Sequence, residues 1–224
     1  MISAVSAHTV EARPLRADAE RNRAKILEAA ADVFASAGVE ATLHDVAARA
    51  GVGVGTVYRR FPHKEALLGA LFDDKLREII EVVQKASAEP DSWQALVGFF
   101  RSFTEMQSQN RGLYEVLNGS EYCQDRVAEA RDLFLPPIQR VLSRAQADGY
   151  VRSDLETSDL TVILLMLNAV GLISQDVSPH LWERYLDLVL EGIRARPEQP
   201  PLSKPALTDD EMEQTTKGWQ RLRR

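Results

Sequence analysis

The chain has 224 residues, enough for one large domain or a small module joined to a larger one, and its 45% hydrophobic content can supply a buried core. The single cysteine, Cys123, cannot form an internal disulfide, and no His or Cys pair has metal-ligand spacing. The N-terminus lacks a basic then apolar leader, and the most apolar stretch, 160–173, is too short to span a bilayer. We therefore expect a cytoplasmic protein without disulfides, metal or cofactor.

The net charge of −6, taken over the whole chain, argues against a nucleic-acid partner. The distribution of charge between regions is more informative than the sum. Residues 1–65 carry nine basic and eight acidic side chains, whereas the remainder carries 18 basic and 25 acidic ones. A near-neutral N-terminal segment with clustered Arg and Lys, attached to an acidic body, suits a protein that meets phosphate on one face. A merely solvated face has the same composition, so charge alone leaves both interpretations open.

Hydrophobic residues recur at helical spacing along nearly the whole chain, and no alternating run predicts a strand. The fold class that we expect is all-α, with a three-helix N-terminal head and a larger helical body. We divide the chain into a disordered arm (1–18), the head (19–65), the body (66–195) and a C-terminal tail (196–224). Four prolines in the tail favour an extended, poorly ordered segment there.

Turn residues set the boundaries of the head helices. Gly38 ends the first helix, Thr42 caps the second and Gly51 ends it. A third, short helix covers 54–61 and closes before Pro62. Two short helices joined around a glycine have the spacing of a helix-turn-helix.

The body should contain one long helix that links it to the head, followed by further helices. The adjacent prolines Pro136 and Pro137 should bend or break the helix that contains them. The predicted helices cover 64–88, 92–109, 112–118, 124–148, 157–174 and 179–195.

The short helix 54–61 has two chemically different faces at 100° per residue. Val57 and Phe61 fall on one face and should enter the core. The opposite face should be free to approach DNA, because glycine permits close backbone approach, hydroxyls bind phosphate and arginine binds phosphate or guanine. It comprises Gly55, Thr56 and Arg59, flanked by Tyr58 and Arg60.

The segments TLHDVA (42–47) and AGVGVGTVYRRFPHKEAL (50–67) resemble the signature of the tetracycline-repressor (TetR) family. The resemblance covers about a quarter of the chain. It implies a DNA-binding head, a helical body that binds a small molecule and dimerises, and repression relieved by that molecule. Gly53 departs from the serine common in the family, which predicts a weaker N-cap on the recognition helix.

The resemblance also assigns roles to individual residues. It places Thr42 and Lys64 on phosphate, Thr56 and Tyr58 on the DNA backbone, and His44, Arg59 and Arg60 on bases or phosphates. A phosphate-binding glycine loop is a poor alternative, because no third glycine follows at position 56 and no Gly-Lys-Ser/Thr motif is present.

A mixture of aromatic and polar residues in the middle helices favours a pocket for a mainly apolar or aromatic effector, although most of these residues should be core. The candidate ligand-binding residues are Phe100, Phe103, Met106, Gln107, Tyr114, Asn118, Tyr122, Arg126, Phe134 and Met166.

The helix 157–174 is apolar on nearly every side, so two surfaces must cover it. In the family that the sequence resembles, the last two helices pair with their copies in a four-helix bundle. We therefore expect a homodimer. The candidate interface residues are Leu164, Leu167, Gly171, Trp182, Leu186, Val189 and Ile193.

The expected function is a DNA-binding transcriptional regulator, a repressor released from a palindromic operator by a small molecule. A regulator without an effector is the first alternative, and an all-α enzyme is a more remote one. No nucleophile stands at a recognisable spacing from the scattered histidines, so we expect no catalytic residues.

Overall fold

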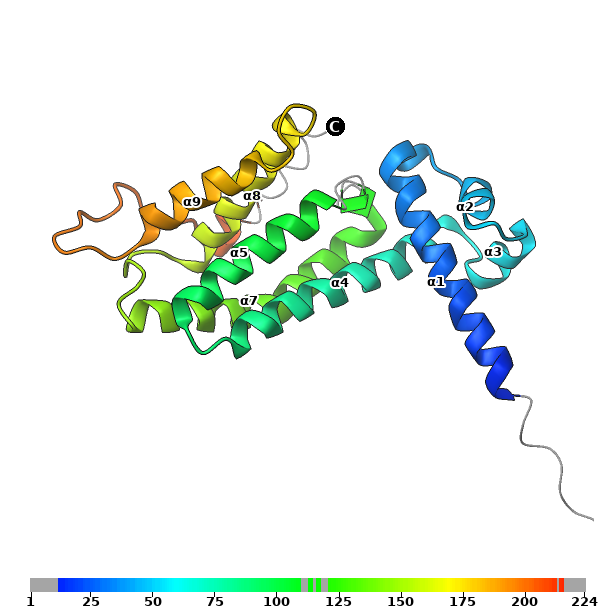
Figure 1. Ribbon diagram of the computed structural model, residues 1–224, viewed down its shortest axis with the longest axis horizontal. Helices are drawn as coiled ribbons and strands as arrows, with labels where there is room; N and C mark the ends of the chain where they lie inside the picture. Colours follow the sequence, from blue (N-terminus) through cyan, green and yellow to red (C-terminus); the bar gives the residue numbers. More distant parts are fainter. Residues whose placement is uncertain (1–11, 110–112, 115, 118–120, 213, 216–224) are drawn as a thin grey trace, which may run out of the picture. The chain divides into compact units, whose positions relative to one another are not determined.

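The computed structural model describes residues 12–109, 113–114, 116–117, 121–212 and 214–215 (Figure 1). Within these ranges all regular structure is helical, which confirms the all-α expectation. The chain divides into two compact units, Met1–Phe72 and Asp73–Arg224, which we call the N-terminal unit and the C-terminal unit. The first unit therefore extends beyond the expected end of the head at residue 65.

The N-terminal unit is built from α1 (Ala12–Ala37), α2 (Leu43–Ala50), α3 (Val54–Arg60) and the beginning of α4 (Lys64–Ala88). Because α1 begins at Ala12, the expected disordered arm over 1–18 is wrong for residues 12–18. This stretch is rich in Ala and Arg, which favour helix, and Pro14 lies in the first turn, where its missing N–H costs nothing.

Two glycines end the first helices of this unit in the left-handed backbone region, at φ 61° for Gly38 and 65° for Gly51. Such φ values favour glycine because they strain residues that carry a Cβ. The small core beneath α3 contains the fully buried side chains of Phe34, Val46, Val57 and Leu67.

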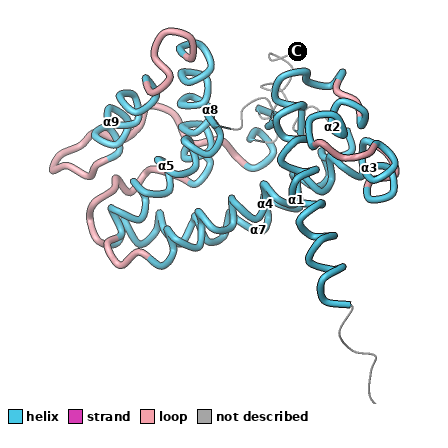
Figure 2. Tube along the Cα trace, turned by 45° about the vertical axis from the view of Figure 1, so that its right-hand side comes forward, coloured by secondary structure: helices cyan, strands magenta, loops and turns pink. Residues whose placement is uncertain are grey.

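The C-terminal unit contains the rest of α4 together with α5 (Ser92–Gln109), α7 (Glu121–Ala147), α8 (Thr157–Ser174) and α9 (Leu181–Ile193). Helix α5 packs on α7, α8 and α9, and α8 and α9 lie side by side (Figures 1 and 2). Of the predicted helix 112–118, residues 113, 114, 116 and 117 are helical, and the others lie outside the described residues.

Helix α7 runs without a break through Pro136 and Pro137, so of the predicted bend or break the break is wrong. Two prolines deprive the carbonyls of Asp132 and Leu133 of their usual donors. Both residues are exposed, so solvent can satisfy these carbonyls and the helix can continue.

The segment after α9 is extended, as its prolines predict, but it is tied to the C-terminal unit. Arg152 donates to the Pro200 carbonyl at 3.0 Å, and the Leu202 amide donates to Asp154 at 2.8 Å. The Arg152 guanidinium, followed by the Leu202 amide, holds the pKa of Asp154 well below its usual range. The expectation of a poorly ordered tail is therefore wrong for the described part around residues 200–202.

Within the described residues, α8 is long and apolar enough to cross a membrane by length and composition alone. One such helix is weak evidence for a membrane protein, because an apolar helix that another protein surface covers meets the same test.

Candidate nucleic-acid interface and cavities of the C-terminal unit

Helix α3 has the two faces that its sequence predicts, except that Thr56 is half-buried rather than exposed. Val57 and the following Phe61 are buried in the N-terminal unit, at 0% and 5% exposure. Gly55, Tyr58 and Arg59 are exposed, and a Cβ built on Gly55 would meet no atom within 4 Å. Apolar anchors thus hold α3 from below and leave a chemically varied, sterically open outer face.

The two arginines of α3 differ in their surroundings. Arg60 lies 3.6 Å from the carboxylate of Glu20 on α1, in an exposed ion pair. Arg59 has no ion-pair partner among the residues that the structure describes, and it shares the open face with Gly55. Of the two, Arg59 is the better placed to reach a new partner.

His44 of α2 and Tyr58 of α3 form an aromatic pair on the same surface. Their ring centroids are 5.8 Å apart and the rings meet edge to face, at 72°. This contact links the exposed side chains of the two helices and limits the directions in which the Tyr58 hydroxyl can point.

Thr42 caps α2, and its hydroxyl already has two partners. It donates to Asp45 Oδ2 at 2.6 Å and accepts from the Asp45 amide at 3.2 Å. The side-chain and then the backbone hydrogen bond from Thr42 lower the pKa of Asp45. By contrast, Gly53 at the N-cap of α3 makes no side-chain cap, as its sequence predicts.

Lys64 begins α4, and its ammonium group lies 5.4 Å from the centroid of the buried Phe34 ring. At the same terminus the Ala66 amide donates to His63 Nδ1 at 3.2 Å, so His63 caps the helix. These contacts hold Lys64 close to the core of the N-terminal unit.

The predicted ligand-binding residues do not surround one cavity. Phe103, Gln107 and Phe134 line a cavity of only about 120 Å³ between α5, α7 and α8. Phe100 and Met106 are core residues, Arg126 pairs with Asp73, and Met166 is 55% exposed; none of the four lines this cavity, and their role in ligand binding stays a prediction. Asn118 and the side chain of Tyr122 lie outside the described residues.

Tyr114 is buried, and its hydroxyl has no hydrogen-bond partner among the described residues. Burial, and to a smaller extent the charge of Glu78, raises the pKa of Tyr114. The hydroxyl therefore stays protonated, but Tyr114 does not line the cavity of Phe103 and Phe134.

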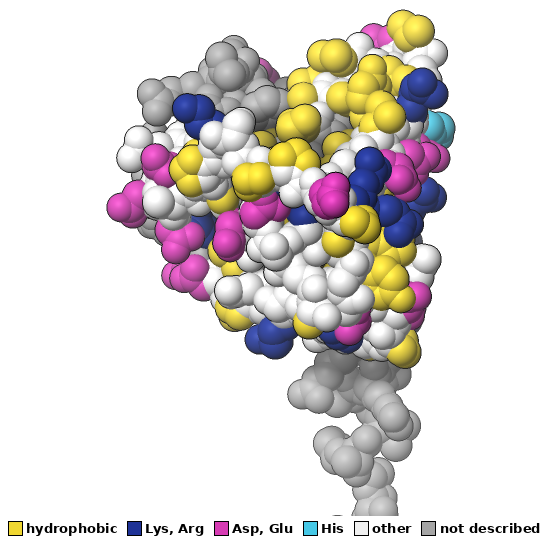
Figure 3. All heavy atoms as spheres, turned by 90° about the vertical axis from the view of Figure 1, so that its left-hand side faces the viewer, with side chains coloured by type: hydrophobic (Ala, Val, Ile, Leu, Met, Phe, Trp, Pro, Cys, Tyr) yellow, Lys and Arg dark blue, Asp and Glu magenta, His cyan; other side chains and the backbone are white. Residues whose placement is uncertain are grey.

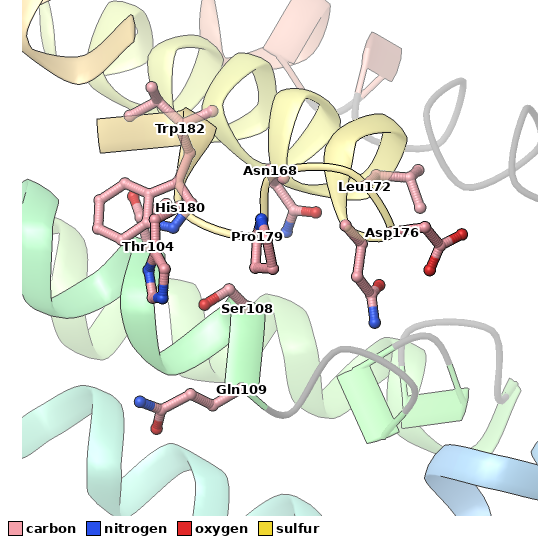
Figure 4. Close-up of a pocket in the computed structure, with 12 residues that line it drawn as sticks. Thr104, Ser108, Gln109, Asn168, Leu172, Asp176, Pro179, His180 and Trp182 are labelled. Carbon is pink, nitrogen blue, oxygen red and sulfur yellow. The ribbon is translucent and has the colours of Figure 1, made fainter. Parts of the chain in front are cut away.

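A larger cavity, of about 380 Å³, lies where α5, α8 and the segment leading into α9 converge (Figure 4). No local pattern in the sequence predicts it, because its wall combines α5 with α8 and the segment before α9, which only the fold brings together. Its lining includes Thr104, Gly171, Asp176, His180 and Trp182.

The candidate interface residues lie on α8 and α9, but most of them face the core of their own subunit. Leu167, Trp182, Leu186 and Ile193 are buried in their own subunit, with exposures from 0% to 6%, so they cannot form a free surface. Leu164 and Val189 are half-buried against the same core, and Gly171 is half-buried beside Trp182. The large exposed apolar residues of α8 and α9 are instead Met166, Ile173, Tyr185 and Leu188.

Hydrophobic side chains gather most densely in the upper part of the surface in Figure 3. Helix α8 is mostly apolar, yet few of its residues are buried within the subunit. An exposed apolar helix of this kind requires a covering surface.

In the described ranges, no group of three or more His, Cys, Asp or Glu side chains could hold a metal ion.

Known proteins match both units of the chain. The family described as "Bacterial regulatory proteins, tetR family" matches residues 26–71, and "Transcriptional regulator SbtR-like, C-terminal domain" matches residues 91–195. The HTH-type transcriptional regulator SrpR of Pseudomonas putida is 29% identical over 202 residues, which are 88% of this chain and 86% of that relative.

Two further proteins are similar over most of the chain. The probable acrEF/envCD operon repressor of Escherichia coli K12 is 28% identical over 169 residues, which are 70% of this chain and 76% of that relative. The crystal structure of a TetR transcription regulatory protein from Mycobacterium vanbaalenii matches with a TM-score of 0.61 and 33% identity, covering 81% of this chain and 100% of that one.

Proposed function

Because the chain belongs to the TetR family of bacterial DNA-binding transcriptional regulators, we propose that it is a cytoplasmic repressor that binds a two-fold operator as a homodimer. A small-molecule effector in the C-terminal unit releases it from DNA. The observation that carries the proposal is the outer face of α3, where Gly55, Tyr58 and Arg59 are exposed above buried anchors.

On DNA, α3 enters the major groove with its exposed face toward the bases. Gly55 lets the backbone approach closely, and Arg59 donates in a fork to a guanine edge. Thr56, Tyr58 and His44 bind the DNA backbone or adjacent bases. Arg60 contributes after it leaves its exposed pair with Glu20, which costs little because exposed pairs are worth about 0–1 kcal/mol.

Phosphate contacts at the edges of the groove set the orientation of α3. Lys64 supplies a positive charge that the phosphates of any DNA sequence attract equally. Thr42 acts through the helix that it caps: its hydroxyl is committed to Asp45, so the free amides at the start of α2 meet the phosphate.

The homodimer forms through the exposed apolar faces of α8 and α9. Met166, Ile173 and Leu188 then become buried against the second subunit, which removes apolar surface from water. The core residues beneath them, such as Leu167 and Leu186, support this surface without touching the partner.

The effector is a mainly apolar or aromatic molecule with one or two polar groups. Helix α4 belongs to both units, so it is the continuous element through which occupancy of the C-terminal unit reaches the N-terminal unit. The relative named as an operon repressor supports repression over activation.

A mobility-shift titration with DNA from upstream of the chain's own gene tests the proposal. We expect a shifted band at nanomolar protein that persists over excess scrambled DNA and disappears when an effector is added. A band that no candidate effector weakens would favour the regulator without small-molecule input. Equal affinity for scrambled DNA would contradict operator recognition.

A further inference from the structure

The cavity between α5, α8 and the start of α9 has the size of a small-molecule site. Its volume is about 380 Å³, and ligand pockets commonly measure about 300–1,000 Å³. In Figure 4, Ser108 of α5 and Asn168 of α8 lie on opposite sides of a shared space. All of the lining residues belong to the C-terminal unit.

Two polar atoms in the wall of this cavity are buried and have no hydrogen-bond partner among the described residues: Thr104 Oγ1 and Trp182 Nε1. Each side chain is only 4% exposed. Buried polar groups in native proteins nearly always have partners, so two such groups in the wall of one cavity favour a bound small molecule as their partner. The indole N–H can only donate, and the occupant must therefore offer an acceptor.

The charges around the cavity argue for an uncharged occupant. Among the described residues of its wall, Asp176 and His180 are the charged or titratable side chains, and both are exposed. His180 Nδ1 already lies 3.2 Å from Glu183. An anion would therefore meet the Asp176 carboxylate and no Lys or Arg from the described part of the wall, and a buried charge without a partner is costly.

The rest of the described wall is uncharged. It combines the apolar Leu167, Leu172, Pro179 and Trp182 ring with the polar Ser108, Gln109, Asn168 and Gln175. We infer that this cavity is the effector site, and that it binds a neutral ring compound whose carbonyl oxygen accepts from Trp182 Nε1 and Thr104 Oγ1. This inference rests on the proposed function, since an effector has meaning only for a regulator that binds DNA.

The position of the cavity also gives the effector a route to the subunit interface. Helix α8 lines the cavity through Gly171 and Leu172, and it exposes Met166 and Ile173 on its surface. A ligand that displaces α8 therefore moves the apolar surface that we assign to the dimer. Small shifts of helices at subunit interfaces are an established means of switching between two states.

Binding can be read directly at the Trp182 indole N–H in the full-length protein. The chain has three tryptophans, so the ¹H–¹⁵N spectrum contains at most three indole signals. The signal that disappears in a Trp182→Phe variant belongs to Trp182. Alternatively, Trp93→Phe and Trp219→Phe remove the other two signals and identify it by elimination. The probes are acetophenone, its counterpart without an oxygen, ethylbenzene, and the anion benzoate.

We expect acetophenone to shift the Trp182 signal downfield, in the direction of a new hydrogen bond, with saturation. Ethylbenzene should shift it much less, and benzoate should bind at least tenfold more weakly than acetophenone. No response to acetophenone, or equal responses to acetophenone and ethylbenzene, would overturn the inference.

Two conservative variants locate the binding without disturbing the fold. A Cβ added at Gly171 would lie 3.9 Å from Trp182 Cδ1, an ordinary contact, so Gly171→Ala should fold and place a methyl group in the cavity. We expect it to weaken acetophenone binding roughly tenfold. The matched control is Gly98→Ala in α5, which meets nothing within 4 Å and should leave binding unchanged.

Thr104→Val removes the unpartnered hydroxyl at nearly constant volume. The melting temperature without ligand should equal or exceed that of the wild type, whereas acetophenone affinity should fall about 2- to 10-fold. Unchanged affinity in both Gly171→Ala and Thr104→Val would place the probe elsewhere and contradict the inference.

The operator assay separates this inference from the proposed function. A concentration of acetophenone just sufficient to saturate the wild type should weaken its binding to the operator. At the same concentration, operator binding by Gly171→Ala should be weakened much less. If the indole signal shifts but the protein binds no upstream DNA, the proposed function fails and the ligand site stands. If DNA binding is intact and acetophenone leaves it unchanged, the assignment of this cavity as the effector site is wrong.

Discussion

The two units place their polar groups in opposite ways. In the N-terminal unit, Tyr58 and Arg59 stand exposed on α3 above a filled core. In the C-terminal unit, Thr104 and Trp182 are buried in the wall of a cavity and each has a polar atom without a partner among the described residues. The first arrangement suits a large partner outside the molecule, and the second suits a small molecule inside it.

The same difference decides what local sequence can predict. Most of the proposed DNA contacts lie on one short helix, so a single periodicity argument separates the anchors from the exposed face. The cavity instead depends on the packing of α5 against α8 and the start of α9, which follow it far along the chain. Substitutions can test each side of this contrast.

The largest effect should come from a charge on the exposed apolar face of α8. Ile173 is 81% exposed, so Ile173→Glu should leave the subunit folded. It should weaken dimerisation by at least about 100-fold, roughly 2.8 kcal/mol, because two carboxylates become buried in an apolar interface. Light scattering across a dilution series measures this directly.

Two controls sharpen the dimer test. Leu133→Glu places the same charge on α7, at another exposed apolar residue, and should leave the dimer intact. Ile193→Glu alters a residue that is 6% exposed, so it should lower the melting temperature rather than yield a folded monomer. A folded, monomeric Ile193→Glu would restore the interface predicted from the sequence alone.

On the N-terminal unit, Arg59→Ala should cost about 1–3 kcal/mol of operator binding and relax the preference at one base position. Arg60→Ala is the matched comparison, and it should lose less because Arg60 already has Glu20 as a partner. Competition binding against operators with single base changes measures both. Equal preference in wild type and Arg59→Ala would show that α3 does not read bases through this residue.

Helix α9 shows what the sequence can predict and what it cannot. Its residues Trp182, Leu186 and Ile193 form a regular apolar stripe, and so do Tyr185 and Leu188 on another side. Periodicity locates the helix but does not say which stripe faces the subunit's own core. The structure buries the first stripe, so the exposed second stripe is the one available to the proposed partner subunit.

Local signals were more dependable where one residue determines one backbone feature. Thr42, Gly38 and Gly51 occupy the cap and left-handed positions that their residue types predict. Pro136 and Pro137 are the exception, since their effect on α7 depends on whether solvent can reach the carbonyls left without donors. Exposure of that kind is a property of packing, and a single sequence does not contain it.

A smaller and less specific effect is expected for Lys64→Ala. It should weaken binding to operator and scrambled DNA alike, and it should reduce the log–log salt slope by about 0.9, because one phosphate contact fewer releases about one counterion fewer. A salt titration on both DNAs is the measurement. A loss confined to the operator would mean that Lys64 reads sequence.

The smallest change is Gly55→Ala, the counterpart in the N-terminal unit of Gly171→Ala in the cavity. In the free protein the added methyl meets nothing within 4 Å, and alanine favours helix by about 0.5–1 kcal/mol, so the melting temperature should rise slightly. Operator affinity should nevertheless fall, because the methyl occupies the space into which DNA comes. A variant that is more stable and binds equally well would exclude close approach at Gly55.

Footprinting of the wild-type dimer on its operator tests the central claim most directly, because it reports the two-fold symmetry and the placement of α3 together. We predict two protected half-sites in a pseudo-palindrome, with centres one helical turn of DNA, roughly 34–36 Å, or a multiple of it apart. Protection of a single asymmetric half-site, or uniform protection without a preferred sequence, would contradict the account.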